Sequence, residues 1–316
     1  MRDIKEINEL FMLTVITALV GSYAFVTLGF NKGGYFISLL YSQFILVLPT
    51  LVYVVKRKVN VKEMFRYHKI KIGTVFLSIL FAFLIMPLMQ EINLISMLFA
   101  RNEISSKIYS ITEGKTFVVS AFVIAVIPAF LEESVYRGCF FNAYSKKSPL
   151  KAIFLSALFF GLMHLNFNQF SYAFAMGMIF CFLVEGTDSI FTSMIVHFVI
   201  NCSSVAMIYL VPIMQKYISS QTGTTLIFNQ DVNVISTKSL LLGICIYGII
   251  AVFTTVLAVL IYIIMIKHEG RLEHVKKMFQ KGSGAGTSEE KESFISLPLI
   301  IAVVICVAYM ILNELV

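Results

Sequence analysis

Long apolar runs separated by short polar gaps dominate the chain. Nine of these runs are long enough, or nearly so, to cross about 30 Å of hydrocarbon as helices. The pattern predicts an all-α fold, a polytopic membrane helical bundle of about eight or nine transmembrane helices. The count stays open because the fifth and sixth runs are short and polar residues interrupt the end of the third. The runs lie at about 10–30, 36–55, 72–90, 116–143, 150–165, 169–185, 190–211, 240–266 and 296–313.

Composition supports a membrane protein and excludes several other classes. The chain of 316 residues is 58% hydrophobic and 14% charged, whereas soluble domains are typically about 45–50% apolar and about 25% charged. An ordinary soluble enzyme, a disordered chain and a disulfide-rich secreted domain are all inconsistent with these values. The first run lacks a small-residue cleavage site, so we interpret it as a retained helix rather than a signal peptide.

The chain has a net charge of +7, and the positions of its basic residues indicate membrane topology. They lie in the gaps between runs, and seven of them crowd the gap at 56–71. By the positive-inside rule this gap faces the cytoplasm, and with nine spans the N-terminus does so too. We therefore expect an integral protein of a bacterial cell membrane that contacts anionic lipid and binds no nucleic acid.

Ionisable side chains inside spans are the candidate functional residues, because each costs at least about 2.5–3.5 kcal/mol to insert. The fourth run contains Glu132, Glu133 and Arg137, with Glu133 and Arg137 on one helical face. The fifth contains His164. The seventh contains His197 and Asn201, four residues apart, so that both point the same way. Glu91, Glu185 and Asp188 lie at span ends, where we expect solvent.

Helical rise places these groups at one depth. Counted from the cytoplasmic ends of three helices, Glu132, His164, His197 and Asn201 lie roughly 10–21 Å below the surface. Hydropathy does not require this coincidence. Pro128, one turn before Glu132, either kinks its helix and frees a carbonyl toward this layer or is an ordinary membrane-helix proline.

Three motifs in these helices resemble those of the CPBP family, which comprises CAAX proteases and bacteriocin-processing or immunity proteins of the Abi type. The family motifs are Glu-Glu-x-x-x-Arg, Phe-x-x-x-His and His-x-x-x-Asn/Asp. The chain has EESVYR at 132–137, FGLMH at 160–164 (Phe160 to His164) and HFVIN at 197–201. Each motif is weak alone, but three in order on successive apolar helices form a fairly specific signal.

The resemblance implies an intramembrane endopeptidase of the glutamic type that hydrolyses peptide bonds with a glutamate-activated water, in a cavity near the cytoplasmic side. It implies that Glu132 is the general base, that His164 assists it, and that His197 and Asn201 stabilise the oxyanion. Glu133 and Arg137 would be a supporting pair. Donors preset around a developing oxyanion contribute about 2.7–4 kcal/mol each, so the chemistry suits these residue types. The implied substrate is a peptide or membrane protein undergoing maturation.

Other interpretations remain open. Glu133 and Arg137 alone are explained by an internal ion pair. Glu132, His164 and His197 are also a possible zinc ligand set, although the helical His-Glu-x-x-His motif is absent; no cofactor is expected otherwise. A non-catalytic scaffold or a bacteriocin immunity protein that binds a partner would retain the same residues. An ion-coupled transporter ranks last, since no repeated half is found.

The resemblance also suggests a division of the chain. Residues 1–115 would form N-terminal transmembrane helices, 116–211 a four-helix CPBP-like catalytic core, and 212–316 the C-terminal helices with a flexible polar loop at 281–293.

Overall fold

All the regular structure in the described residues is helical. The computed structural model describes residues 4–222, 236–280 and 293–315, and eight helices in these ranges are long and apolar enough to span a membrane. The predicted loop at 281–293 falls outside them apart from its last residue. The helices are α1 Ile4–Thr27, α2 Gly34–Lys56, α3 Val61–Met64, α4 Ile72–Ser96, α5 Ile104–Thr112, α6 Phe117–Ala121, α7 Ile127–Glu133, α8 Asn142–Ser145, α9 Pro149–Leu162, α10 Phe167–Thr187, α11 Ile190–Thr222, α12 Thr237–His268, α13 Leu272–Met278 and α14 Leu297–Leu315, with a 3₁₀ turn η1 Phe30–Gly33 and π-helical segments η2 Phe122–Val126 and η3 Ser134–Phe141.

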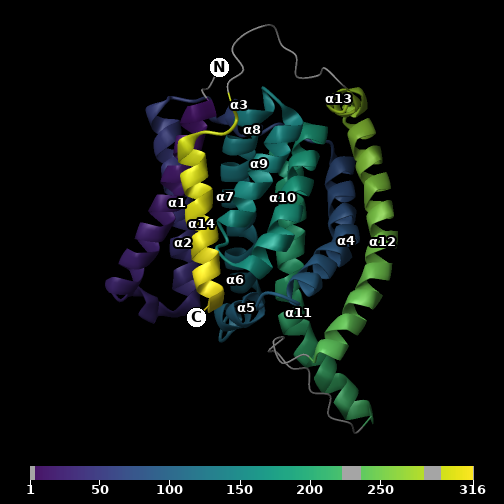
Figure 1. The fold of residues 1–316 in the computed structure, drawn as a ribbon. Coiled ribbons are helices and arrows are strands. Elements are labelled where there is room, and N and C mark those ends of the chain that lie inside the picture. Colours follow the sequence, from purple (N-terminus) through teal and green to yellow (C-terminus); the bar gives the residue numbers. More distant parts are fainter. Residues whose placement is uncertain (1–3, 223–235, 281–292, 316) are drawn as a thin grey trace.

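The helices run side by side and confirm the predicted polytopic bundle (Figure 1). Every predicted run is helical, and the third continues through Pro87, Gln90 and Glu91 to Ser96. The basic gaps that contain α3, α8 and α13 lie at the end of the bundle that holds the N-terminus. α5 and the C-terminus lie toward the other end. The expected separation of basic gaps from the remaining loops is therefore present, and which end faces the cytoplasm stays a prediction.

The fourth run forms one long helical rod, Phe117–Ser145, with two π-helical stretches. Pro128 has no N–H, so the carbonyl of Ile124, four residues earlier, loses its normal helical donor. The π-helical η2 lies just before Pro128, as is common where the helical ladder is interrupted near functional residues. Pro128 thus frees a carbonyl, which is one part of the first interpretation of this residue; the kink stays a prediction.

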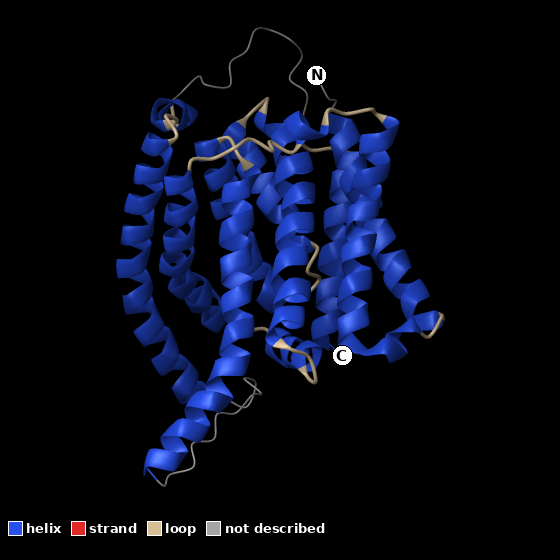
Figure 2. Ribbon diagram, turned by 180° about the vertical axis from the view of Figure 1, so that it is seen from behind, coloured by secondary structure: helices blue, strands red, loops and turns tan. Residues whose placement is uncertain are grey.

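Helices α9 and α10 form a hairpin in which α9 is too short to span the membrane. α9 has 14 residues, about 21 Å of rise against about 30 Å of hydrocarbon. The α9–α10 connection at 163–166 accordingly lies inside the bundle (Figure 2). This explains why the sequence left the count at eight or nine: α9 enters the bundle without completing a span, and it carries His164 into the interior.

Close contact between the two arms of the hairpin depends on glycine. A Cβ at Gly177 would lie 2.8 Å from Cα of Ala157, a backbone atom that cannot rotate away. We expect Gly177→Ala to lower the thermal unfolding temperature in detergent, because overpacking costs about 1–3 kcal/mol. Gly243→Ala is the matched control: its Cβ meets only a leucine methyl at 3.6 Å, so helix propensity should leave stability equal or higher. Equal midpoints for the two variants would contradict the prediction.

A buried ion-pair network attaches the segment between α3 and α4 to the end of the bundle at which the N-terminus lies. Arg66 contacts Glu185 at 2.7 Å and donates to Asn142 and Ser145. His274 lies 2.6 Å from the other oxygen of Glu185. Glu185 is only 3% exposed, so the expectation that it is solvated was wrong. Sequence position placed it correctly at a span end, but the basic loop folds back over it and replaces water.

Candidate active site

The two adjacent glutamates of the fourth run point into different surroundings. Glu133 is fully buried, whereas the side chain of Glu132 keeps 13% of its surface exposed. Consecutive residues on a helix are separated by about 100°, which is enough to bury one carboxylate completely and leave part of the other exposed. Glu132 is therefore the carboxylate that water can reach.

Glu133 joins two other predicted site residues. Its Oε1 accepts a hydrogen bond from Nη1 of Arg137 at 3.0 Å and lies 3.0 Å from Nδ1 of His197. A carboxylate paired with a guanidinium is ionised and only accepts, so Nδ1 of His197 must carry the hydrogen. The Nε2 lone pair of a neutral His197 is then directed elsewhere. Glu133 thus fixes both the tautomer and the ring orientation of this histidine.

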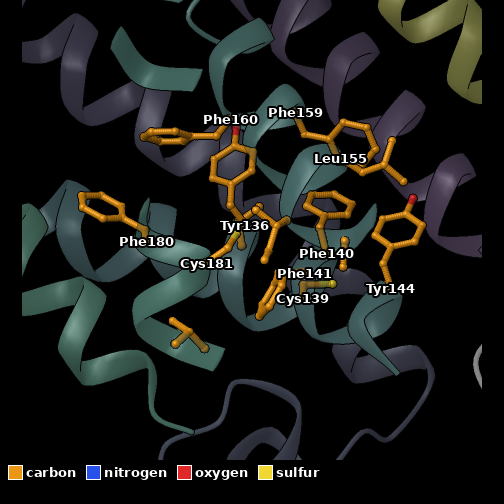
Figure 3. Close-up of a cluster of buried hydrophobic side chains, with 14 of the residues drawn as sticks. Tyr136, Cys139, Phe140, Phe141, Tyr144, Leu155, Phe159, Phe160, Phe180 and Cys181 are labelled. Carbon is orange, nitrogen blue, oxygen red and sulfur yellow. The ribbon is translucent and has the colours of Figure 1, made fainter. Parts of the chain in front are cut away.

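Aromatic rings surround the other side of Arg137. The guanidinium carbon lies 4.3 Å from the ring centroid of Phe160 and 5.0 Å from that of Phe180. Both rings belong to the aromatic cluster between η3, α9 and α10 (Figure 3). Cation–π contacts of this kind contribute up to about 2 kcal/mol when desolvated. They help to explain how a charge with no exposed surface persists here.

Glu132 faces the two histidines. Nε2 of His197 lies 3.9 Å from Oε2 of Glu132, beyond hydrogen-bond distance. His164, at the tip of the α9–α10 hairpin, is close enough to interact electrostatically with both Glu132 and His197. Its Nδ1 lies 2.7 Å from the carbonyl oxygen of Phe160. A carbonyl only accepts, so Nδ1 carries the hydrogen and Nε2 is left to bind a proton or a water.

Asn201 is engaged with the backbone of the fourth run. Its Nδ2 donates to the carbonyl oxygen of Ile124 at 3.1 Å, the carbonyl that Pro128 deprives of a helical donor. This bond ties α11 to η2 one turn before Pro128. The amide nitrogen carries a second hydrogen. This second N–H is the one that Asn201 would donate to an oxyanion.

Glu132 has one further partner that no sequence motif indicates. Gln43, in α2, donates from Nε2 to Oε1 of Glu132 at 2.7 Å. Gln43 is 6% exposed and lies about 20 Å from the Lys56 end of its helix by helical rise, as deep as Glu132 lies below Ser145. A polar amide in an otherwise apolar run at the common depth was the available signal. Because this amide carries no charge, it is not among the ionisable side chains that the sequence marks as costly to insert.

The residues were also tested as a metal site. In the part of the chain that the structure describes, no three His, Cys, Asp or Glu side chains are grouped closely enough to hold a metal ion. Nδ1 of both histidines faces a protein oxygen, which leaves one nitrogen of each ring for other partners. Glu132, His164 and His197 are thus neighbours without forming an assembled ligand set in this conformation.

Comparison with known proteins identifies one family. Residues 114–203 match "Type II CAAX prenyl endopeptidase Rce1-like", a segment of less than a third of the chain that includes all three motifs. No curated protein and no solved structure matched the chain. The match supports, at the level of the family, an integral membrane protease of the CAAX type. Over residues 114–203, then, the chain is similar to Rce1-like type II CAAX prenyl endopeptidases, which confirms the resemblance that the motifs predicted.

Proposed function

We propose that the protein is an intramembrane endopeptidase that hydrolyses peptide bonds with a water activated by Glu132. The observation that carries this proposal is a single arrangement. The partly accessible carboxylate of Glu132, which belongs to the family-matched segment, lies 2.7 Å from the amide nitrogen of Gln43 and 3.9 Å from the imidazole of His197. A base needs both access to water and groups that fix its orientation.

The reaction assigns each group one task. Glu132 removes a proton from water, assisted by Nε2 of His164, and the hydroxide attacks the scissile carbonyl carbon. The carbonyl oxygen becomes an oxyanion that accepts from the second N–H of Asn201. It also accepts from Nε2–H of His197 when that ring carries a proton on both nitrogens, a positive charge that Glu133 beside Nδ1 balances. Collapse of the intermediate breaks the C–N bond. Glu132 returns its proton to the leaving amine.

The substrate we propose is a peptide or membrane protein that is cleaved during maturation. The basic gaps gather at the bundle end that carries the N-terminus (Figure 1). By the positive-inside rule this end is cytoplasmic. The assay compares membranes with and without the protein and reads peptide fragments by mass spectrometry. Absence of any protein-dependent fragment in a broad substrate screen would favour the non-catalytic scaffold or immunity protein.

Chelation tests the glutamate mechanism against a zinc-dependent variant. We expect the cleavage rate to be unchanged after exhaustive dialysis against a strong chelator, because the base and the polar donors belong to the chain itself. The measurement is the initial rate on a cleaved peptide before and after dialysis, with a known zinc protease as the positive control. A loss of rate that added zinc restores would assign Glu132, His164 and His197 to a metal instead.

A further inference from the structure

Gln43 reaches the reacting carboxylate from outside the segment that carries the family match. It belongs to α2, whereas the match covers residues 114–203. α2 packs against α7, and the Nε2 of Gln43 donates to Oε1 of Glu132 at 2.7 Å. A hydrogen bond to an ionised acceptor is short and about twice as strong as one between neutral groups. Among the described side chains, Gln43 is the only one within hydrogen-bond distance of Glu132, since Nε2 of His197 lies 3.9 Å away.

The other end of the same amide is unsatisfied. Oε1 of Gln43 is buried and has no hydrogen-bond partner among the described residues. A buried acceptor without a donor costs about 1–3 kcal/mol, and such groups in native proteins call for a partner or a role. A carboxylate cannot supply the missing hydrogen, because an ionised carboxylate only accepts. The missing donor is a group that enters the site.

Water is the donor that fits both halves of the amide. Nε2 and Oε1 are bonded to the same carbon, so a water that donates to Oε1 lies next to the carboxylate that Nε2 holds. That water can donate its second hydrogen to Glu132, which is the arrangement a base needs before it removes a proton. Buried waters typically make two to four hydrogen bonds to groups of this kind.

We propose that Gln43 is a further catalytic residue: through Nε2 it fixes the carboxylate of Glu132, and through Oε1 it binds the water that this carboxylate deprotonates. The inference rests on the proposed function and extends it to a helix that the family motifs do not include. It also gives the N-terminal helices a part in the chemistry, where sequence alone assigned the site to residues 116–211.

The first test is kinetic. Gln43→Met keeps the length and bulk of the side chain and removes both polar atoms. We expect kcat to fall about ten- to a hundredfold with KM changed little, since a misplaced base and water impair chemistry more than binding. Thr50→Val is the matched control on the same helix: its buried hydroxyl also has no partner among the described residues, and it lies about two turns from Gln43. A Gln43→Met enzyme with the wild-type kcat would overturn the proposal.

The second test needs no substrate and separates this inference from the proposed function. A double-mutant cycle combines Gln43→Met and Glu132→Met and measures thermal unfolding midpoints of the purified full chain in detergent. If the amide and the carboxylate interact, the double variant will differ from the sum of the single effects. Additive effects would overturn the role of Gln43 even if the protein cleaves peptides. Non-additive effects in a chain that cleaves nothing would refute the proposed function while supporting the contact.

Discussion

Glu132→Gln is expected to lower the cleavage rate about 10²–10⁴-fold while leaving the fold intact. General base catalysis contributes rate factors of this size, and an amide at position 132 cannot take a proton from water at neutral pH. The substitution is nearly isosteric. Its side-chain oxygen can still accept from Nε2 of Gln43, so the interhelical contact between α2 and α7 is retained. The measurement is kcat on any peptide that the wild type cleaves, together with the unfolding midpoint.

Glu91→Gln is the matched control for that experiment. Glu91 is also a carboxylate on a helix long and apolar enough to span a membrane, α4, and it makes no described contact with the candidate site. We expect the Glu91→Gln variant to cleave its substrate at close to the wild-type rate. Equal rates for Glu132→Gln and the wild type would remove Glu132 from the mechanism. Equal losses in the two glutamine variants would show that any intramembrane carboxylate change impairs the preparation, and the assignment to Glu132 would not stand.

The helical framework followed from hydropathy, because length and apolar content fix which segments a bilayer accepts. All nine predicted runs are helices, although their ends shift by several residues; α11 continues to Thr222, well beyond the predicted 211. Residues outside the hydrocarbon explain such shifts, since apolar content marks the membrane-buried part of a helix and says little about where the helix stops. Hydropathy also could not show that α9 ends inside the bundle.

Only part of the candidate site could be predicted from the sequence. Charged residues in spans are conspicuous because they are costly, which is how Glu132, Glu133, Arg137 and the two histidines came to be grouped. A neutral amide is cheaper to bury, so Gln43 did not stand out in its apolar run. The contact between Glu133 and His197 depends on how α7 and α11 pack, and a spacing rule within one helix cannot describe it.

That contact bears on whether Glu133 and Arg137 are more than an internal ion pair. Pairing alone would balance the charge of the guanidinium, although its Nε and Nη2 have no hydrogen-bond partner among the described residues. The same Oε1 of Glu133 also holds Nδ1 of His197. We therefore expect Glu133→Gln to reduce kcat by more than its effect on folding explains, because His197 loses the carboxylate that orients its ring and balances its positive charge. The readout is kcat per folded molecule. An unchanged kcat would leave the pair with a structural role only.

Arg137→Met is expected to cause the largest loss of stability. Both partners are fully buried, and removing one partner of a buried pair destabilises by about 3–5 kcal/mol because the remaining charge is left uncompensated. The measurement is the free energy of unfolding in detergent, or the yield of folded protein where unfolding is irreversible. The double variant Glu133→Gln with Arg137→Met removes both charges and should recover part of the loss. If the double variant is no more stable than Arg137→Met alone, the cost lies in the packing against Phe160 and Phe180 rather than in the stranded carboxylate.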